Sequence, residues 1–194
     1  MTCIRVCKEA RTCPSLASRR YYFEPNPCTA QEWREKERVY LSGIDPRVVF
    51  VCESPGKFGS DDQAAPLRCW AKANTWRDKR FREALERYGF ANCYITNAVK
   101  CGVREGRQHK KCELTRCRRW LVRELKLIQP LVVVGVGENA YRTLCQDVLH
   151  LLDSPPEISK ITHFYFRGDV WPRWEQEFPQ LQRLLEHLKP RSDW

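Results

Sequence analysis

Short runs of apolar and β-branched residues, each ending in a turn signal, constrain the fold of this chain more than any other feature. The runs are Arg47 to Glu53, Asn92 to Asn97 and Leu131 to Gly135, and Lys160 to Phe166 is a fourth strand or strand-like segment. Each has the length of a strand, and the first and third are apolar enough to be buried on both faces of a sheet.

Helical patterns separate these runs. They cover Asp78 to Tyr88, Glu113 to Ile128, Asn139 to Leu152 and Val170 to Leu188, with one more at Glu32 to Leu41. Strands that alternate with helices predict an α/β fold, in which a central parallel four-stranded sheet is flanked by helices. We expect a single domain over residues 28–194, preceded by an irregular, cysteine-containing segment over residues 1–27.

Charge and cysteine content restrict the partners and the cofactor. The 34 Lys and Arg residues exceed the 24 Asp and Glu residues, which gives a formal net charge of +10 and favours a polyanion such as nucleic acid as the partner. No apolar run is long enough to span a membrane, and the N-terminus lacks a secretory signal. We therefore expect a cytoplasmic, nucleoid-associated monomer, in which 11 cysteines indicate a metal or cluster rather than a disulfide framework. Intracellular disulfides of the kind that hyperthermophiles form are the alternative.

Polar residues follow the predicted strands. Glu53 and Ser54 end the first, Asn97 ends the second, and His163 lies on the fourth segment. In open α/β sheets, ligands bind beside the carboxyl ends of the strands. These residues are therefore candidates for one site.

The order and spacing of these motifs resemble the uracil-DNA glycosylase superfamily, closest to its fourth and fifth, iron–sulfur-containing families. The resemblance is carried by Cys52-Glu-Ser-Pro-Gly56, by Tyr94-Ile-Thr-Asn-Ala-Val-Lys-Cys101, and by a helix that starts near Cys117 and leads to Pro130 and the Val-rich strand. The family's last motif begins with His, and here it reads His163-Phe-Tyr-Phe-Arg167.

The resemblance implies a catalytic role for three residues. Glycosidic cleavage creates negative charge on the base, and His163 would donate to O2 as that charge develops. Ser54 and the backbone would position the attacking water, with Glu53 in a structural or assisting role. Asn97 would read the O4 and N3–H edge of uracil, because one amide offers both an acceptor and a donor.

The resemblance also implies how the base and the DNA are held. Gly56 replaces a Tyr that blocks 5-methyl groups in the most uracil-selective family, so other damaged bases could enter. Leu67 occupies the usual position of the stacking Phe, and Phe58 or Trp70 could supply the ring instead. Arg167 lies where relatives insert a side chain into the duplex. Lys100 and Arg104, from a basic segment between Lys100 and Arg119, would contact phosphates.

Four cysteines would hold a 4Fe-4S cluster. Cys101 and Cys117 match the third and fourth ligands of the iron–sulfur families, and Cys28 resembles the second. Pro25 stands where the first ligand belongs, so Cys13 is preferred over Cys3 and Cys7. A zinc ion with the same ligands, or free buried thiols, are the alternatives. Cys52, Cys93 and Cys145 are expected to be core residues.

The resulting expectation is a monofunctional DNA glycosylase that removes uracil from DNA by base flipping and water attack. Two alternatives stay open. The substrate could be another damaged base, such as hypoxanthine, xanthine or a 5-substituted pyrimidine, which the Gly56 position motivates. The chain could also be a non-catalytic DNA-binding relative, which the altered residues after His163 motivate.

Overall fold

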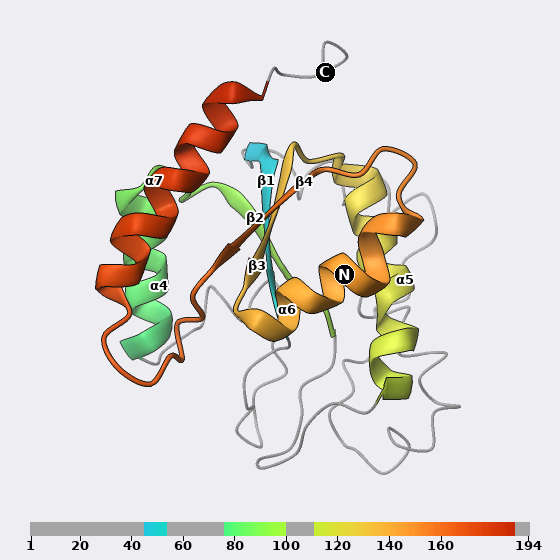
Figure 1. The fold of residues 1–194 in the computed structure, drawn as a ribbon, viewed down its shortest axis with the longest axis horizontal. Coiled ribbons are helices and arrows are strands. Elements are labelled where there is room, and N and C mark those ends of the chain that lie inside the picture. The colour runs from blue at the N-terminus through green and yellow to red at the C-terminus, as the bar shows by residue number, and fades with distance from the viewer. Residues whose placement is uncertain (1–44, 54–75, 100–110, 189–194) are drawn as a thin grey trace, which may run out of the picture.

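A computed structural model describes residues 45–53, 76–99 and 111–188 (Figure 1). The predicted helix from Glu32 to Leu41 and the predicted N-terminal segment over residues 1–27 lie outside these ranges. The division of the chain into that segment and one domain therefore stays a prediction.

The central sheet has four parallel strands in the order β2-β1-β3-β4. The strands are β1 (Asp45–Cys52), β2 (Cys93–Asn97), β3 (Val132–Val136) and β4 (Glu157–Ile161). β1 pairs with β2 on one side and with β3 on the other, and β3 pairs with β4. The predicted α/β class with a four-stranded parallel sheet is confirmed.

Helices cover both faces of this sheet. In Figure 1, α4 (Trp76–Arg87) and α7 (Trp171–His187) lie together on one side, and α5 (Lys111–Ile128) and α6 (Glu138–Thr143) lie on the other. A π-helical turn, Leu144–Val148, and a 3-10 turn, Leu149–Leu151, follow α6. The helical path predicted for Asn139 to Leu152 is therefore present, but its pitch changes twice.

Burial of β1 on both faces explains its continuous apolar sequence. Phe50 belongs to the core beneath α4 and α7, whereas Val49 and Val51 belong to the core beneath α5. The first of these cores is aromatic: the Phe50 ring meets Phe81 at 6.1 Å and Phe90 at 5.6 Å, both edge to face. Such pairs add about 0.5–1.5 kcal/mol to the free energy gained by burial, so the aromatic side fixes α4 and α7 against the sheet.

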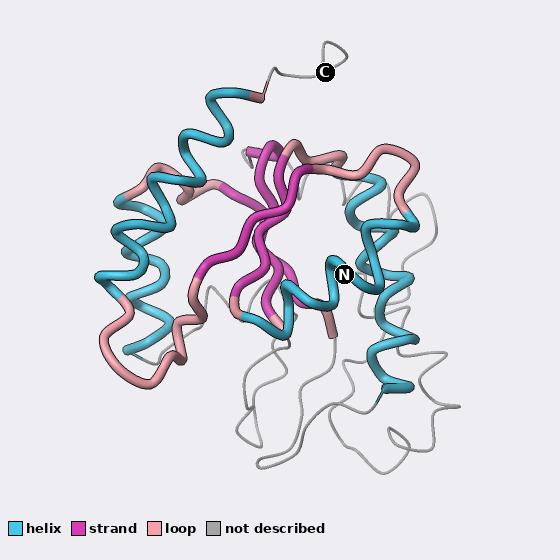
Figure 2. Tube along the Cα trace, in the orientation of Figure 1, coloured by secondary structure: helices cyan, strands magenta, loops and turns pink. Residues whose placement is uncertain are grey.

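The fourth predicted strand is wrong in its position. It was expected over Lys160 to Phe166, but β4 ends at Ile161, and the Phe166 N–H donates to the His163 carbonyl at 2.9 Å in a turn. Aromatic residues favour strands, which explains the expectation. Here Phe164 instead packs on Phe81 of α4, with 5.1 Å between the ring centroids, so the chain turns out of the sheet (Figure 2).

The three cysteines expected in the core differ in burial. Cys52 is buried and Cys93 is half-buried, but Cys145 is exposed, so the expectation for Cys145 is wrong. Leu144 and Val148 take the inward positions of the π-helical turn, which leaves Cys145 on its outer side. Among the described residues, no helix has both the length and the apolar character needed to cross a bilayer.

Candidate active site

The carboxyl ends of the four parallel strands meet at one edge of the sheet. Two backbone hydrogen bonds extend the pairing of β1 and β2 beyond their last residues, since Ala98 N–H donates to the Cys52 carbonyl at 2.7 Å and Val99 N–H to the Glu53 carbonyl at 2.9 Å. Glu53, which is half-buried, is thereby held beside the end of β2. Glu53 and Asn97, which the sequence predicts to share one site, thus lie at adjacent strand ends.

Asn97 is a buried amide at the end of β2, with 2% of its surface exposed. The preceding residue, Thr96, donates its hydroxyl to the buried Glu124 carboxylate of α5 at 2.9 Å. Because successive side chains of a strand alternate, Asn97 faces the α4 and α7 side. Its side-chain amide carries both an acceptor oxygen and a donor NH2 group.

His163 lies in the turn after β4, and its ring is oriented by its neighbours. The Tyr165 backbone N–H donates to Nδ1 of His163 at 3.0 Å. Since Nδ1 accepts, the neutral imidazole carries its proton on Nε2. The ring also stacks on Phe164, with 4.3 Å between centroids and an angle of 22°, and Phe164 is itself held by α4 as described above.

Thr162, the residue before His163, is fixed by α7. The Glu177 carboxylate accepts two hydrogen bonds of 2.7 Å, one from the Thr162 backbone N–H and one from its hydroxyl. The Trp174 indole N–H donates to the Thr162 carbonyl at 2.8 Å. Three hydrogen bonds to one residue anchor the start of the turn that carries His163.

Gly137, between β3 and α6, supports His163 from the other side. Its N–H donates to the Ile161 carbonyl at 2.8 Å, and its φ of +87° is one that L side chains rarely adopt. A Cβ at this position would lie 2.9 Å from the His163 Cβ and 3.2 Å from its Cδ2. Only glycine therefore allows this close approach without a shift of the histidine.

The strand order sets the distance between Asn97 and His163. They follow β2 and β4, the two edge strands, with β1 and β3 between them. Since neighbouring strands lie roughly 4.8 Å apart, the two strand ends are separated by roughly 14 Å. This spacing applies to the strand ends, since the His163 side chain lies against Gly137, which follows β3, the strand next to β4. Glu53 follows β1, between Asn97 and Gly137.

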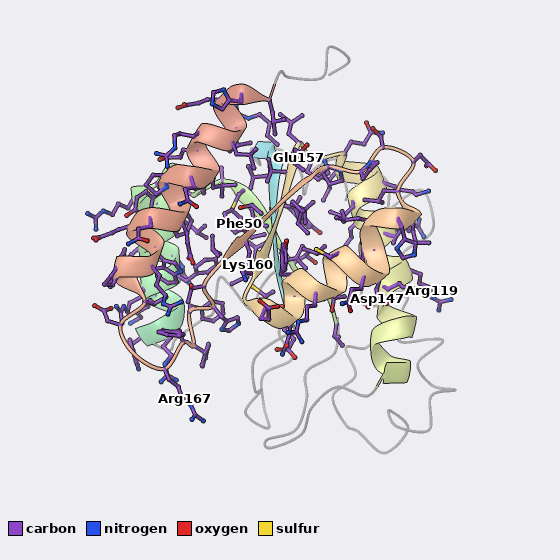
Figure 3. All side chains as sticks on the ribbon, in the orientation of Figure 1. Phe50, Arg119, Asp147, Glu157, Lys160 and Arg167 are labelled. Carbon is purple, nitrogen blue, oxygen red and sulfur yellow. The ribbon has the colours of Figure 1, made fainter. Side chains whose placement is uncertain are left out.

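Most other predicted site residues fall outside the described ranges. These are Ser54, Gly56, Phe58, Trp70, Lys100 and Arg104. Arg167 is described, is exposed, and projects from the turn between β4 and α7 (Figure 3). It shares this turn with His163.

Sequence reasoning missed Thr162, Glu177 and Gly137. Glu177 looks like a solvated position of an amphipathic helix, and no local signal links it to a threonine 15 residues earlier. Gly137 had a detectable signal, because a glycine directly after a buried strand often permits a close backbone approach.

Of the four cysteines predicted to hold an iron–sulfur cluster, only one lies in the described ranges. Cys13, Cys28 and Cys101 lie outside them, and Cys117 lies on α5, which starts near the strand-end edge (Figure 1). No group of three His, Cys, Asp or Glu side chains within the described ranges could hold a metal ion. The donor set itself, four thiolates, fits an iron–sulfur cluster.

The chain is similar in sequence to known proteins. The chain is 27% identical to the type-4 uracil-DNA glycosylase of Archaeoglobus fulgidus over 150 residues, which cover 74% of this chain and 70% of the relative. It is 26% identical to the type-4 uracil-DNA glycosylase of Sulfurisphaera tokodaii, over 72% of this chain and 65% of that relative. The sequence profile of the Uracil DNA glycosylase superfamily matches residues 39–175, a range that contains Glu53, Asn97 and His163. The chain belongs to the uracil DNA glycosylase superfamily.

Proposed function

We propose that this protein is a monofunctional DNA glycosylase that excises uracil from DNA as the first step of base excision repair. The single observation that carries the proposal is the hydrogen bond from Tyr165 N–H to His163 Nδ1. It leaves the Nε2 proton of a neutral imidazole as the donor, and a donor is what a leaving uracil needs at O2. The two type-4 relatives, named as uracil-DNA glycosylases, support the same substrate.

Recognition of uracil is assigned to Asn97. Its amide oxygen would accept from N3–H of the base, and its NH2 group would donate to O4. Cytosine presents an amino group in place of O4 and an unprotonated N3, so with the amide held in this orientation both contacts would be mismatched. Burial of Asn97 increases this discrimination, because unpaired polar groups are costly away from water.

The reaction breaks the bond between C1′ of the sugar and N1 of uracil. The bonding electron pair leaves with the base and is delocalised onto O2, where His163 stabilises it. A water positioned by Ser54, with Glu53 assisting, adds to C1′ and releases a proton to solvent. The uracil anion takes up a proton from solvent, which leaves an abasic site and neutral uracil. No lysine is needed as a nucleophile, since water supplies the new bond.

Several residues outside the described ranges complete the proposal. Phe58 or Trp70 would stack on the flipped base, and Gly56 would line the side of the 5-position. Lys100 and Arg104 would contact phosphates, as would Arg167 unless it inserts into the duplex. Base–aromatic stacking contributes about 1–3 kcal/mol per base, so loss of the stacking ring should weaken the flipped state.

A 4Fe-4S cluster on Cys13, Cys28, Cys101 and Cys117 is proposed as a structural cofactor. It would bind the N-terminal segment to the chain after β2 and to α5. No step of the reaction passes through it.

Excision under single-turnover conditions tests the function. Oligonucleotides that carry uracil, hypoxanthine, xanthine or thymine opposite guanine are incubated with excess protein and cleaved at abasic sites. We expect uracil to be released fastest. Release of only another base would identify that base as the substrate, and no release from any DNA that the protein binds would establish a non-catalytic DNA-binding protein.

A further inference from the structure

Three exposed aromatic rings gather beside the turn that carries His163. Trp76 of α4 is 57% exposed, and Tyr165 and Phe166 of the turn are 42% and 36% exposed. The described ranges expose only one other large hydrophobic side chain, Leu151. Exposed apolar side chains that cluster, rather than scatter, mark an interaction site.

Arginines lie between these rings. The Arg77 guanidinium lies 5.0 Å from the centroids of both Trp76 and Tyr165, and Arg80 lies 5.3 Å from Trp76. Arg173 of α7 lies 4.4 Å from the Phe166 ring. We call these six residues, Trp76, Arg77, Arg80, Tyr165, Phe166 and Arg173, the arginine–aromatic surface.

The arginine–aromatic surface is fixed in place by Asp169. Its carboxylate accepts from Arg80 at 2.6 Å and from the Trp171 backbone N–H at 3.2 Å. These two donors, the Trp171 amide first, hold the pKa of Asp169 below its usual range, so the carboxylate is ionised at neutral pH. Asp169 thus ties the start of α7 to α4 and keeps the two parts of the surface together.

This surface is continuous with the candidate active site. Tyr165 donates its backbone N–H to His163 and also contacts Arg77 with its ring. The surface therefore begins two residues from the imidazole. Arg167, the next residue after Phe166, projects from the same turn (Figure 3).

Rings interleaved with guanidinium groups suit a strand of unpaired nucleotides. Each base offers a face for stacking, and each phosphate offers a partner for arginine. In a duplex the bases are already stacked on each other, so exposed rings have little to contact. On these grounds we propose that the arginine–aromatic surface binds unpaired nucleotides of the DNA strand that flanks the target base, with Trp76 as the outer stacking ring. This inference rests on the proposed function for its DNA substrate and adds a preference for single-stranded DNA.

Binding of uracil-free DNA tests the inference without any excision. Fluorescence anisotropy at fixed salt compares a labelled thymine-containing single strand with its duplex. Trp76→Ala should weaken single-strand binding by roughly 5- to 150-fold, the range that stacking of one base implies, and should change duplex binding less than twofold. Trp76→Phe should retain most of the affinity.

The matched control is Leu151→Ala, which removes an exposed hydrophobic side chain of the 3-10 turn and should leave both affinities unchanged. Equal losses on single strand and duplex in Trp76→Ala, or no loss on either, would overturn the inference. A third result would also overturn it. If Trp76→Ala weakens binding by the same factor on a strand whose flanking nucleotides are replaced by base-free sugars, the loss does not come from stacking, because that strand offers no base to stack on.

These outcomes are separable from those of the proposed function. If the protein excises uracil but Trp76→Ala binds single strands normally, the proposed role of the arginine–aromatic surface is wrong and the proposed uracil excision is supported. If the protein excises no base but Trp76→Ala selectively loses affinity for single strands, the proposed uracil excision is wrong and the proposed role of the arginine–aromatic surface is supported.

Discussion

The carboxylate of Glu177 accepts both the backbone N–H and the hydroxyl of Thr162, each at 2.7 Å. A helix that starts after the turn thereby fixes the residue that precedes His163. The orientation of the imidazole thus depends on α7 as well as on its own local hydrogen bond to Tyr165.

Glu177→Ala should slow uracil excision without weakening DNA binding. Alanine removes both carboxylate oxygens, so the backbone N–H and the hydroxyl of Thr162 lose the hydrogen bonds that hold this residue to α7. Misplacement of a reacting group by about 1 Å costs up to roughly 100-fold in rate, and we expect a loss of roughly 10- to 100-fold in single-turnover excision. Glu175→Ala is the control, since Glu175 is exposed and its nearest ion-pair partner, Arg87, is 3.9 Å away. Equal rates for Glu177→Ala and wild type would show that Glu177 does not position His163.

Gly137→Ala and Gly89→Ala form a matched pair. Both glycines have positive φ, +87° and +79°, but a Cβ at Gly89 would have no heavy atom within 4 Å, whereas one at Gly137 would press on His163. Each substitution should lower the free energy of unfolding by about 1–2 kcal/mol through backbone strain. Only Gly137→Ala should also lose excision at a temperature where both variants are folded. If thermal melts and rates decline in parallel for both, the contact between Gly137 and His163 has no catalytic effect.

The sequence predicted β1 and β3 well because both are buried on both faces of the sheet. Residues 48–52 of β1 and all of β3 have no polar positions to reveal a period, and their length, β-branching and turn signals sufficed. The turn at His163 was misread because the aromatic run Phe164 to Phe166 has strand propensity, while its rings in fact contact α4 and the arginines. Local propensity cannot anticipate such tertiary contacts.

Sequence motifs predicted the candidate site residues, but they did not predict the residues that hold these in place. Asn97 and His163 were identified from their places after strands. The bonds of Glu177 to Thr162 and of Thr96 to Glu124 join residues 15 and 28 positions apart. Helix positions such as Glu124 and Glu177 look solvent-facing until the packing partner is known.

Asn97→Asp should exchange one base preference for another. A carboxylate cannot donate to O4 of uracil, but it can accept from the amino group of cytosine. We expect uracil excision to fall by at least roughly 100-fold, the loss typical of a site whose polar groups are mismatched, and weak cytosine excision to appear. Asn97→Ala should lose uracil excision with no gain for cytosine. Wild-type uracil release by Asn97→Ala would remove this residue from the recognition site.

Cys117→Ala should abolish cluster binding. The purified wild-type protein is expected to be brown, with broad visible absorbance and about four iron atoms per chain, as a 4Fe-4S cluster requires. Cys117→Ala should be colourless and less stable, because metal-site binding energy contributes to folding. Cys145→Ala, which alters an exposed cysteine, should keep the colour and the iron. One zinc ion per chain and no iron in the wild type would contradict the cluster.

Single-turnover excision by His163→Ala tests the proposed catalytic mechanism most directly. The imidazole is assigned to charge that appears on uracil only as the glycosidic bond breaks, so its removal should affect the transition state and not ground-state binding. Single-turnover uracil excision should fall by roughly 10²–10³-fold, as it does on loss of one such donor, while the affinity for uracil-containing DNA at matched salt stays within twofold of wild type. Excision by His163→Ala at the wild-type rate would contradict the proposed mechanism, because the group that stabilises the leaving uracil would then not be His163.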